Sequence, residues 1–126
     1  SFFGIQEKHG INLLTKIRVE FSDLRDHRFS HNFNCISPIC SCGIEDESST
    51  HFFLCCPRFS CHRLNLLSKL SEIMNTDVKV LPKQHLAQII LYGSNVFNEI
   101  TNRLILEQSI LYIKNTKRFT ILEAFS

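Results

Sequence analysis

The chain has 126 residues, of which 44% are hydrophobic and 21% are charged, values typical of a single globular domain. Its net charge of +2 is too weak to indicate a nucleic-acid-binding protein by bulk charge alone. No stretch reaches the roughly 18 to 20 uncharged apolar residues of a membrane-spanning helix, and no secretory signal is visible. The six cysteines all lie between Cys35 and Cys61, so we expect a reduced intracellular protein of the nucleus or cytoplasm.

Helical periodicity recurs along the chain and predicts an all-α fold, a small helical domain with an inserted CCHC zinc knuckle. Ser22-Asp23 is a helix-start signal, Thr50 can cap a short helix from His51, and Gly93 stands where a C-terminal cap belongs. The expected helices are 9–21, a short one carrying Leu24 and Arg28, a short one from His51, 57–74, 83–92 and 95–117.

In two of these helices the spacing of apolar residues predicts a buried face. The first helix should bury Ile11, Leu14, Ile17 and Phe21, with Leu13 and Val19 at its flanks. The last should bury Phe97, Ile100, Leu104, Ile105, Leu111 and Tyr112.

Residues 35–57 have the composition of a metal-binding loop inserted between helices. Cys40-Ser41-Cys42-Gly43 can supply two ligands from a tight turn, and Gly43 allows the positive φ that a backbone bending around a metal often needs. Cysteines clustered beside a histidine favour a metal site over a disulfide framework, which usually joins distant segments. The sequence therefore predicts one bound zinc ion.

His51 is the third candidate ligand, and two cysteines compete to be the fourth. Cys55 lies four residues after His51 and shares its face of an α-helix. Cys56 lies five residues after it, about 140° around a regular helix, but Pro57 can distort the helix and bring Cys56 back. Spacing alone leaves both alternatives open.

The remaining cysteines and histidines are less suited to the metal. We interpret Cys35 and Cys61 as small packing thiols, and His27 and His31 as solvated or contact residues. A catalytic thiol needs one exposed thiolate beside a base, and clustered sulfurs do not fit that pattern. The acidic run 45–47 has the composition of a solvated loop.

One motif runs from Cys40 to Pro57: Cys40-Ser-Cys42-Gly43, then Glu47, then His51-Phe52-Phe53-Leu54, closing on Cys56-Pro57. It resembles the C-terminal zinc-binding segment of non-LTR (LINE-type, jockey-like) retrotransposon reverse transcriptases, whose pattern is roughly C-x-C-G, an acidic residue, Thr or Ser, then H-F-L-L-x-C-P. The flanks resemble that family too, in Leu13-Leu14-x-x-Ile17-Arg18-Val19, Phe21-Ser22-Asp23-Leu24-x-x-His27-Arg28-Phe29-x-His31-Asn32-Phe33, Leu91-Tyr92-Gly93-Ser94 and Ile113-x-x-Thr116-Lys117-Arg118-Phe119.

The resemblance implies that the zinc ligands are Cys40, Cys42, His51 and Cys56. It also implies a longer polyprotein in which this segment follows the polymerase and holds template RNA or target DNA during target-primed reverse transcription. The chain opens on Ser1 within what reads as a structural element, and we treat 1–126 as one C-terminal domain of such a protein. It has neither a Tyr-x-Asp-Asp polymerase signature nor an endonuclease motif, so we expect no enzymatic activity in the chain itself.

Basic and aromatic side chains flank the knuckle and suit phosphate contact and base stacking. The candidates for nucleic-acid binding are His27, Arg28, Phe29, His31, Arg58, Arg63, Lys117 and Arg118, with Phe33 nearby. A second hypothesis is a structural or protein-interaction module whose apolar faces dock on the missing polymerase region or another protein. Neither hypothesis involves a membrane or a small-molecule substrate.

Overall fold

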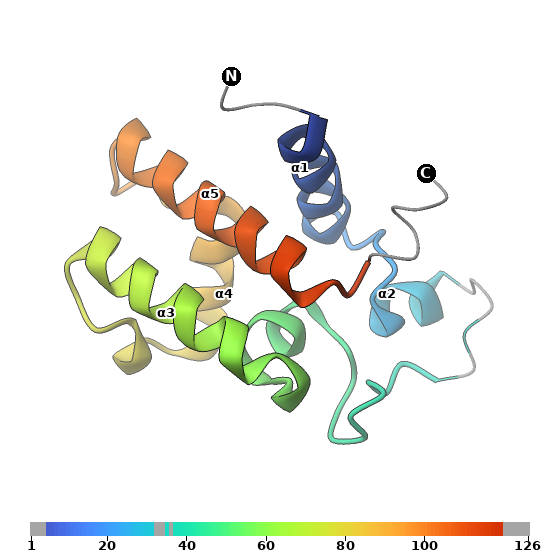
Figure 1. The fold of residues 1–126 in the computed structure, drawn as a ribbon. Helices are drawn as coiled ribbons and strands as arrows, with labels where there is room; N and C mark the ends of the chain where they lie inside the picture. The colour runs from blue at the N-terminus through green and yellow to red at the C-terminus, as the bar shows by residue number, and fades with distance from the viewer. Residues whose placement is uncertain (1–4, 32–34, 36, 120–126) are drawn as a thin grey trace.

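The computed structural model describes residues 5–31, 35 and 37–119, and these residues are mostly helical (Figure 1). The elements are α1 (Ile5–Arg18), α2 (Arg25–Ser30), the π-helix η1 (His51–Cys55), the 3₁₀-helix η2 (Pro57–Phe59), α3 (Ser60–Met74), the 3₁₀-helix η3 (Val78–Val80), α4 (Lys83–Tyr92) and α5 (Glu99–Thr116). The described segments contain no β-strand beyond an isolated bridge between Ile39 and Asp46. The all-α prediction is confirmed. Across these segments, no helix is long and apolar enough to cross a membrane.

Helix α5 is the centre of the fold and packs against α1, α3 and α4 (Figure 1). Its contact with α1 is close, because a Cβ on Gly10 would collide with Cγ2 of Ile110. Its contact with α4 includes a buried hydrogen bond, in which the Ser109 hydroxyl donates to the Ile90 carbonyl oxygen at 2.8 Å. Glycine and serine therefore stand where the helix backbones approach one another.

The buried face of α5 differs from the predicted one. Ile105 and Tyr112 are buried as expected, but the side chains of Ile100, Leu104 and Leu111 are 72%, 40% and 46% exposed. The helix carries apolar residues on more than one side, and packing against α1, α3 and α4 buries Ile105, Ile110, Tyr112 and Ile113 instead. The prediction for Ile100, Leu104 and Leu111 is wrong.

Helix α1 ends earlier than the sequence pattern suggested. Leu13, Leu14 and Ile17 are buried, but the helix stops at Arg18 and Glu20 adopts a positive φ of 59°. Val19 and Phe21 follow the end of the helix, and their exposed fractions are 62% and 50%. The predicted burial of Phe21 is therefore wrong.

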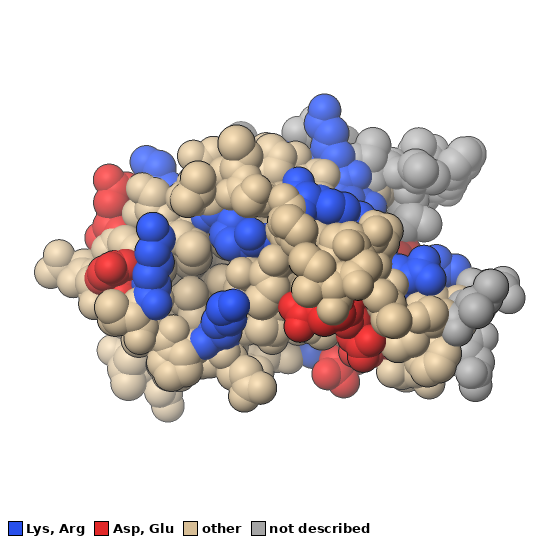
Figure 2. Space-filling model, turned by 90° about the horizontal axis from the view of Figure 1, so that it is seen from below, with Lys and Arg blue, Asp and Glu red and all other residues tan. Residues whose placement is uncertain are grey.

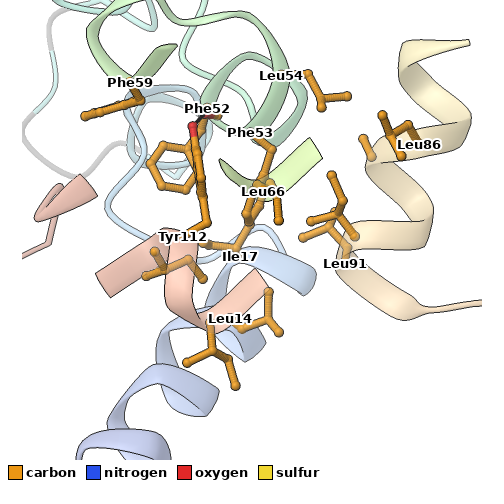
Figure 3. Close-up of a cluster of buried hydrophobic side chains, with 14 of the residues drawn as sticks. Leu14, Ile17, Phe52, Phe53, Leu54, Phe59, Leu66, Leu86, Leu91 and Tyr112 are labelled. Atoms are coloured by element: carbon orange, nitrogen blue, oxygen red, sulfur yellow. Dashed lines mark hydrogen bonds between the residues drawn. The ribbon is translucent and has the colours of Figure 1, made fainter. Parts of the chain in front are cut away.

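The core continues directly into the segment that carries the metal-ligand candidates. Phe52 and Phe53, from η1, are fully buried and meet edge to face with ring centroids 4.9 Å apart. Phe52 also contacts the rings of Phe59 and Tyr112 at 5.5 Å and 5.3 Å, and Figure 3 shows these side chains gathered beside Ile17 and Leu66. The aromatic core therefore fixes one side of η1, and His51 extends from it.

Candidate metal centre

Four side chains from the loop and from η1 form a cluster that could hold a metal ion. The ligand atoms of Cys40, Cys42, His51 and Cys56 all lie within 4.8 Å of one another. The Cys40 and Cys56 sulfurs are 3.8 Å apart, and the Cys42 sulfur is 3.3 Å from Nε2 of His51. Cys40, His51 and Cys56 are buried and Cys42 is half-buried. The three thiols and one imidazole therefore converge on a single point.

A tight turn positions the first pair of sulfurs. The Gly43 amide donates to the Cys40 carbonyl oxygen at 2.8 Å, and Gly43 has a φ of 82°. No heavy atom lies within 4 Å of where a Gly43 Cβ would stand, so backbone conformation and not space is the reason for glycine there. Two further bonds of 2.8 Å, from the Cys40 amide to the Glu45 carbonyl and from the Glu47 amide to the Pro38 carbonyl, hold the loop as a narrow hairpin. The role predicted for Gly43 is confirmed.

The π-helical form of η1 brings Cys56 and not Cys55 to the cluster. The Cys56 amide donates to the carbonyl oxygen of His51, five residues earlier, at 2.8 Å. In a π-turn the backbone hydrogen bond joins residues five apart and so brings the backbone of Cys56 back to His51, whereas an α-helix pairs residues four apart. Cys55 lies outside the cluster, half-buried beside Glu45 and Lys83. The choice that spacing left open therefore falls on Cys56.

Two side chains, from α3 and α5, donate hydrogen bonds to backbone carbonyls at the end of η1. The Tyr112 hydroxyl donates to the Phe52 carbonyl at 2.6 Å, which is the oxygen that an α-helical Cys56 amide would have used. The Arg63 guanidinium donates to the carbonyls of Phe53, at 3.2 Å, and Cys56. At the other end, the Ser48 hydroxyl and not Thr50 caps the turn, accepting from the His51 amide at 3.1 Å. The predicted Thr50 cap is wrong, because Thr50 itself has a helical backbone.

Replacing Tyr112 by phenylalanine should destabilise the fold by about 1–3 kcal/mol, because the Phe52 carbonyl would remain buried without its donor. Burial raises the pKa of the Tyr112 hydroxyl, which is therefore neutral and able to donate at physiological pH. Chemical denaturation measures the change. Tyr92→Phe is the matched control: its hydroxyl donates to the Arg18 carbonyl at 2.6 Å, but Tyr92 is 53% exposed and water can replace it. Equal losses in the two variants would contradict the role assigned to Tyr112.

A carboxylate orients the imidazole of His51. Its Nδ1 lies 2.6 Å from Oε2 of Glu45, which leaves Nε2 directed at Cys42 and the rest of the cluster. The hydrogen bond to His51 lowers the pKa of the Glu45 carboxyl, even though this side chain is half exposed. Such a carboxylate–histidine pair fixes the tautomer with the lone pair on Nε2, as a metal ligand requires.

Glu47, read from the sequence as part of a solvated loop, is one of the most buried side chains of the site. Only 1% of it is exposed, and it accepts two hydrogen bonds from Arg118, at 2.6 Å and 2.8 Å, and one from Arg58, at 2.8 Å. The Arg25 backbone amide donates to it as well, at 2.8 Å. Although burial opposes ionisation, Arg118 and the other donors lower the pKa of Glu47, so the carboxylate is charged. The interpretation of 45–47 as a solvated run is therefore wrong for Glu47.

Arg58 connects this carboxylate to the sulfurs. Its guanidinium donates to the Cys56 sulfur at 3.2 Å and to the Cys40 sulfur at 3.1 Å. Burial alone would raise the pKa of the Cys56 thiol, but the hydrogen bonds from Arg58 lower it to about 7. Burial raises the pKa of Cys40 to about 11, so Cys56 is the thiol of this pair that ionises more readily. Because metals bind the thiolate form of cysteine, Arg58 favours metal binding by stabilising the Cys56 thiolate.

The residues predicted to bind nucleic acid fall into three groups. His27 and Arg63 serve the fold: His27 is 3% exposed, bonded to the Ser22 hydroxyl at 2.7 Å, with its pKa lowered by burial, and Arg63 donates to η1. Arg58 and Arg118 reach the surface in part, with exposed side-chain fractions of 33% and 19%. The others, Arg28, Phe29, His31 and Lys117, are half-buried or exposed, and Phe33 lies outside the described residues.

Cys35 and Cys61 stay apart from the cluster, as the sequence suggested. The Cys35 thiol donates to the Ser37 carbonyl at 3.0 Å, and Cys61 is exposed on α3.

Comparison of the chain with protein-family models, curated proteins and solved structures finds no match. Function is therefore inferred from the residues and their arrangement.

Proposed function

We propose that the chain is a zinc-binding, nucleic-acid-binding module, the C-terminal region of a retrotransposon reverse transcriptase, that holds template RNA or target DNA. The observation that carries the proposal is the Cys40–Cys42–His51–Cys56 cluster, because these are the four positions to which the resemblance assigns zinc. The motif concerns residue types and their spacing, the cluster concerns the positions of side-chain atoms, and both point to the same four residues.

Zinc is the metal that this donor set fits best. Three thiolates and one neutral imidazole are a common structural zinc set, with four protein ligands in a tetrahedron. In a tetrahedral site with zinc–sulfur bonds of about 2.3 Å, two sulfur ligands lie about 3.8 Å from each other. The distance between the Cys40 and Cys56 sulfurs is 3.8 Å. Four protein ligands leave no position for a substrate or a reactive water, so we propose a structural and not a catalytic role.

Binding to nucleic acid would draw on the basic side chains around the centre. Full-length chain loaded with zinc is expected to bind labelled single-stranded RNA or DNA, with an affinity that falls steeply as salt rises, because phosphate contacts release counterions. Fluorescence anisotropy over a salt titration measures this affinity. Each phosphate contact contributes about 0.7 to the slope of log affinity against log salt concentration. No binding of either strand at low salt would contradict the proposal.

A second candidate function is a structural or interaction module, which one observation favours. Ile100, Leu104 and Leu111 are 40–72% exposed and recur at helical spacing along one side of α5, and apolar side chains that form a patch are typical of protein contacts. Apolar docking hardly responds to salt, whereas phosphate binding does. The same titration therefore distinguishes the two functions.

A further inference from the structure

A polar cavity of about 410 Å³ lies beside the metal centre, and its lining is strongly basic. Its lining residues come from α2, the metal-binding loop, η2 and the end of α5. The charged residues that line it are Arg25, Arg28, Glu47, Arg58, Lys117 and Arg118. Its size is within the range of sites that bind small ligand groups.

The charges of this cavity do not balance. Five cationic side chains face one carboxylate, which leaves an excess of four positive charges in the lining. A centre of one divalent metal and three thiolates would contribute a single negative charge beside it, so an excess of three remains. Like charges held this close in a concave wall repel one another and attract an anion.

The basic side chains are dispersed on the face that Figure 2 presents. There, Lys and Arg side chains of the described residues stand in separate groups, with Asp and Glu among them. The net charge of the whole chain is only +2, whereas the cavity lining alone carries an excess of four positive charges. Local concentration, and not bulk charge, is what an anion would encounter.

The cavity is rigid on one side. Glu47 holds both nitrogens of the Arg118 fork, at 2.6 Å and 2.8 Å, and one nitrogen of Arg58, at 2.8 Å. Positive groups fixed by the fold lose little conformational entropy when an anion arrives. The cavity thus holds positive charge that the fold has already fixed in place.

Arg28 and Lys117 line the same cavity from the two sides. Arg28 lies on α2, and Lys117 is the left-handed residue, φ 54°, that ends α5. Guanidinium and ammonium groups are the main phosphate ligands of proteins, Arg through its planar fork and Lys as a point charge. Phe29, next to Arg28, is 44% exposed and can stack on a base beside a bound phosphate.

We infer that this cavity is the phosphate-binding site of a nucleic-acid strand, with Arg28 and Lys117 contacting the phosphate and Arg58 and Arg118 supplying fixed positive charge. The inference rests on the proposed nucleic-acid function and adds to it the place where the strand is held. The metal centre acts on this site through Arg58, which contacts both the sulfurs and the cavity.

The test compares the zinc-loaded full chain with the variant Arg28→Gln/Lys117→Gln, which removes two charges and keeps the side-chain stems. Lys69→Gln/Lys79→Gln is the matched control, because it makes the same change in net charge at exposed positions of α3 and η3 that do not line the cavity. The probes are labelled single-stranded RNA and the DNA of the same sequence, followed by anisotropy from low to high salt.

The cavity variant should bind both probes roughly 25-fold more weakly at about 0.1 M salt, approach the parent chain near 1 M, and show a salt slope smaller by about 1.4, since each single-strand phosphate contact contributes about 0.7. The control should change by less than about threefold, because exposed charges far from the strand are screened. Arg28→Gln alone and Lys117→Gln alone are each expected to lower the affinity about fivefold. These single variants provide the same test if the double variant does not fold.

Cavity and control variants that bind alike would overturn the inference and leave the proposed function standing. A parent chain that binds neither RNA nor single-stranded DNA at low salt would overturn both. The two failures are therefore distinguishable in one experiment.

Discussion

Cys56→Ser is expected to lower the zinc content of the purified chain from about one ion per chain to nearly none, whereas Cys55→Ser keeps it. The two cysteines are adjacent and undergo the same chemical change. They differ in that the π-turn bond from the Cys56 amide to His51 places Cys56 in the cluster and leaves Cys55 outside it. Elemental analysis after dialysis against a weak chelator measures the metal.

Loss of the ion should also lower the stability of the fold. A metal that binds only the native state contributes about 4 kcal/mol when its free concentration is a thousandfold above its Kd. We expect the parent chain and Cys55→Ser to lose stability when a strong chelator is added, and Cys56→Ser to be insensitive to it. Thermal unfolding with and without chelator measures the difference.

Cys61→Ser provides a second control, because Cys61 is exposed on α3 and lies outside the cluster. It should behave like the parent chain in both measurements. If Cys55→Ser lost the metal and Cys56→Ser retained it, the assignment of the fourth ligand would be wrong. A parent chain that is purified fully folded and holds no metal by elemental analysis would contradict the metal centre itself.

The ligand set shows what spacing can and cannot decide. Clustered Cys and His residues around Gly43 were enough to predict a metal centre, because the chemistry depends on residue type and short loops. The choice between Cys55 and Cys56 depended on η1 being a π-turn. That form is held by Tyr112 and Arg63, one of them 60 residues away from the carbonyl it binds, so no local pattern contains it.

Helix α5 shows a different limit. Periodicity located the helix, but apolar residues occur on several of its sides, and packing against α1, α3 and α4 selects the side that is buried. Gly10 and Ser109 were the available signals, since small residues often mark close helix contacts. They were not distinctive enough to identify the buried face from a single sequence.

Electrostatic partners were the least predictable part of the site. Glu45, Asp46 and Glu47 look alike in sequence, yet Glu45 orients His51, Asp46 is exposed and Glu47 is buried under two arginines. The partner Arg118 lies 71 residues from Glu47. The resemblance, in which an acidic residue is part of the motif, was the one signal that set Glu47 apart.

Glu47→Ala should destabilise the fold by about 3 kcal/mol, which is the second large effect we expect. Removing one partner of a buried ion pair leaves the other charge without compensation, a loss of about 3–5 kcal/mol when both partners are buried. Glu47 is 1% exposed, but the side chains of Arg58 and Arg118 are 33% and 19% exposed and can regain some water, so the lower end applies. Chemical denaturation of the zinc-loaded chain measures it.

Two further variants separate charge from position. Glu47→Gln keeps the volume and some acceptor capacity but removes the charge, so it should lose less than the alanine variant. Asp46→Ala, one residue away and exposed, should change stability by less than about 0.5 kcal/mol. If Glu47→Ala were as mild as Asp46→Ala, Glu47 would not be the anchor of Arg58 and Arg118. The metal centre and the basic cavity would then have to be held together by the backbone of the loop alone.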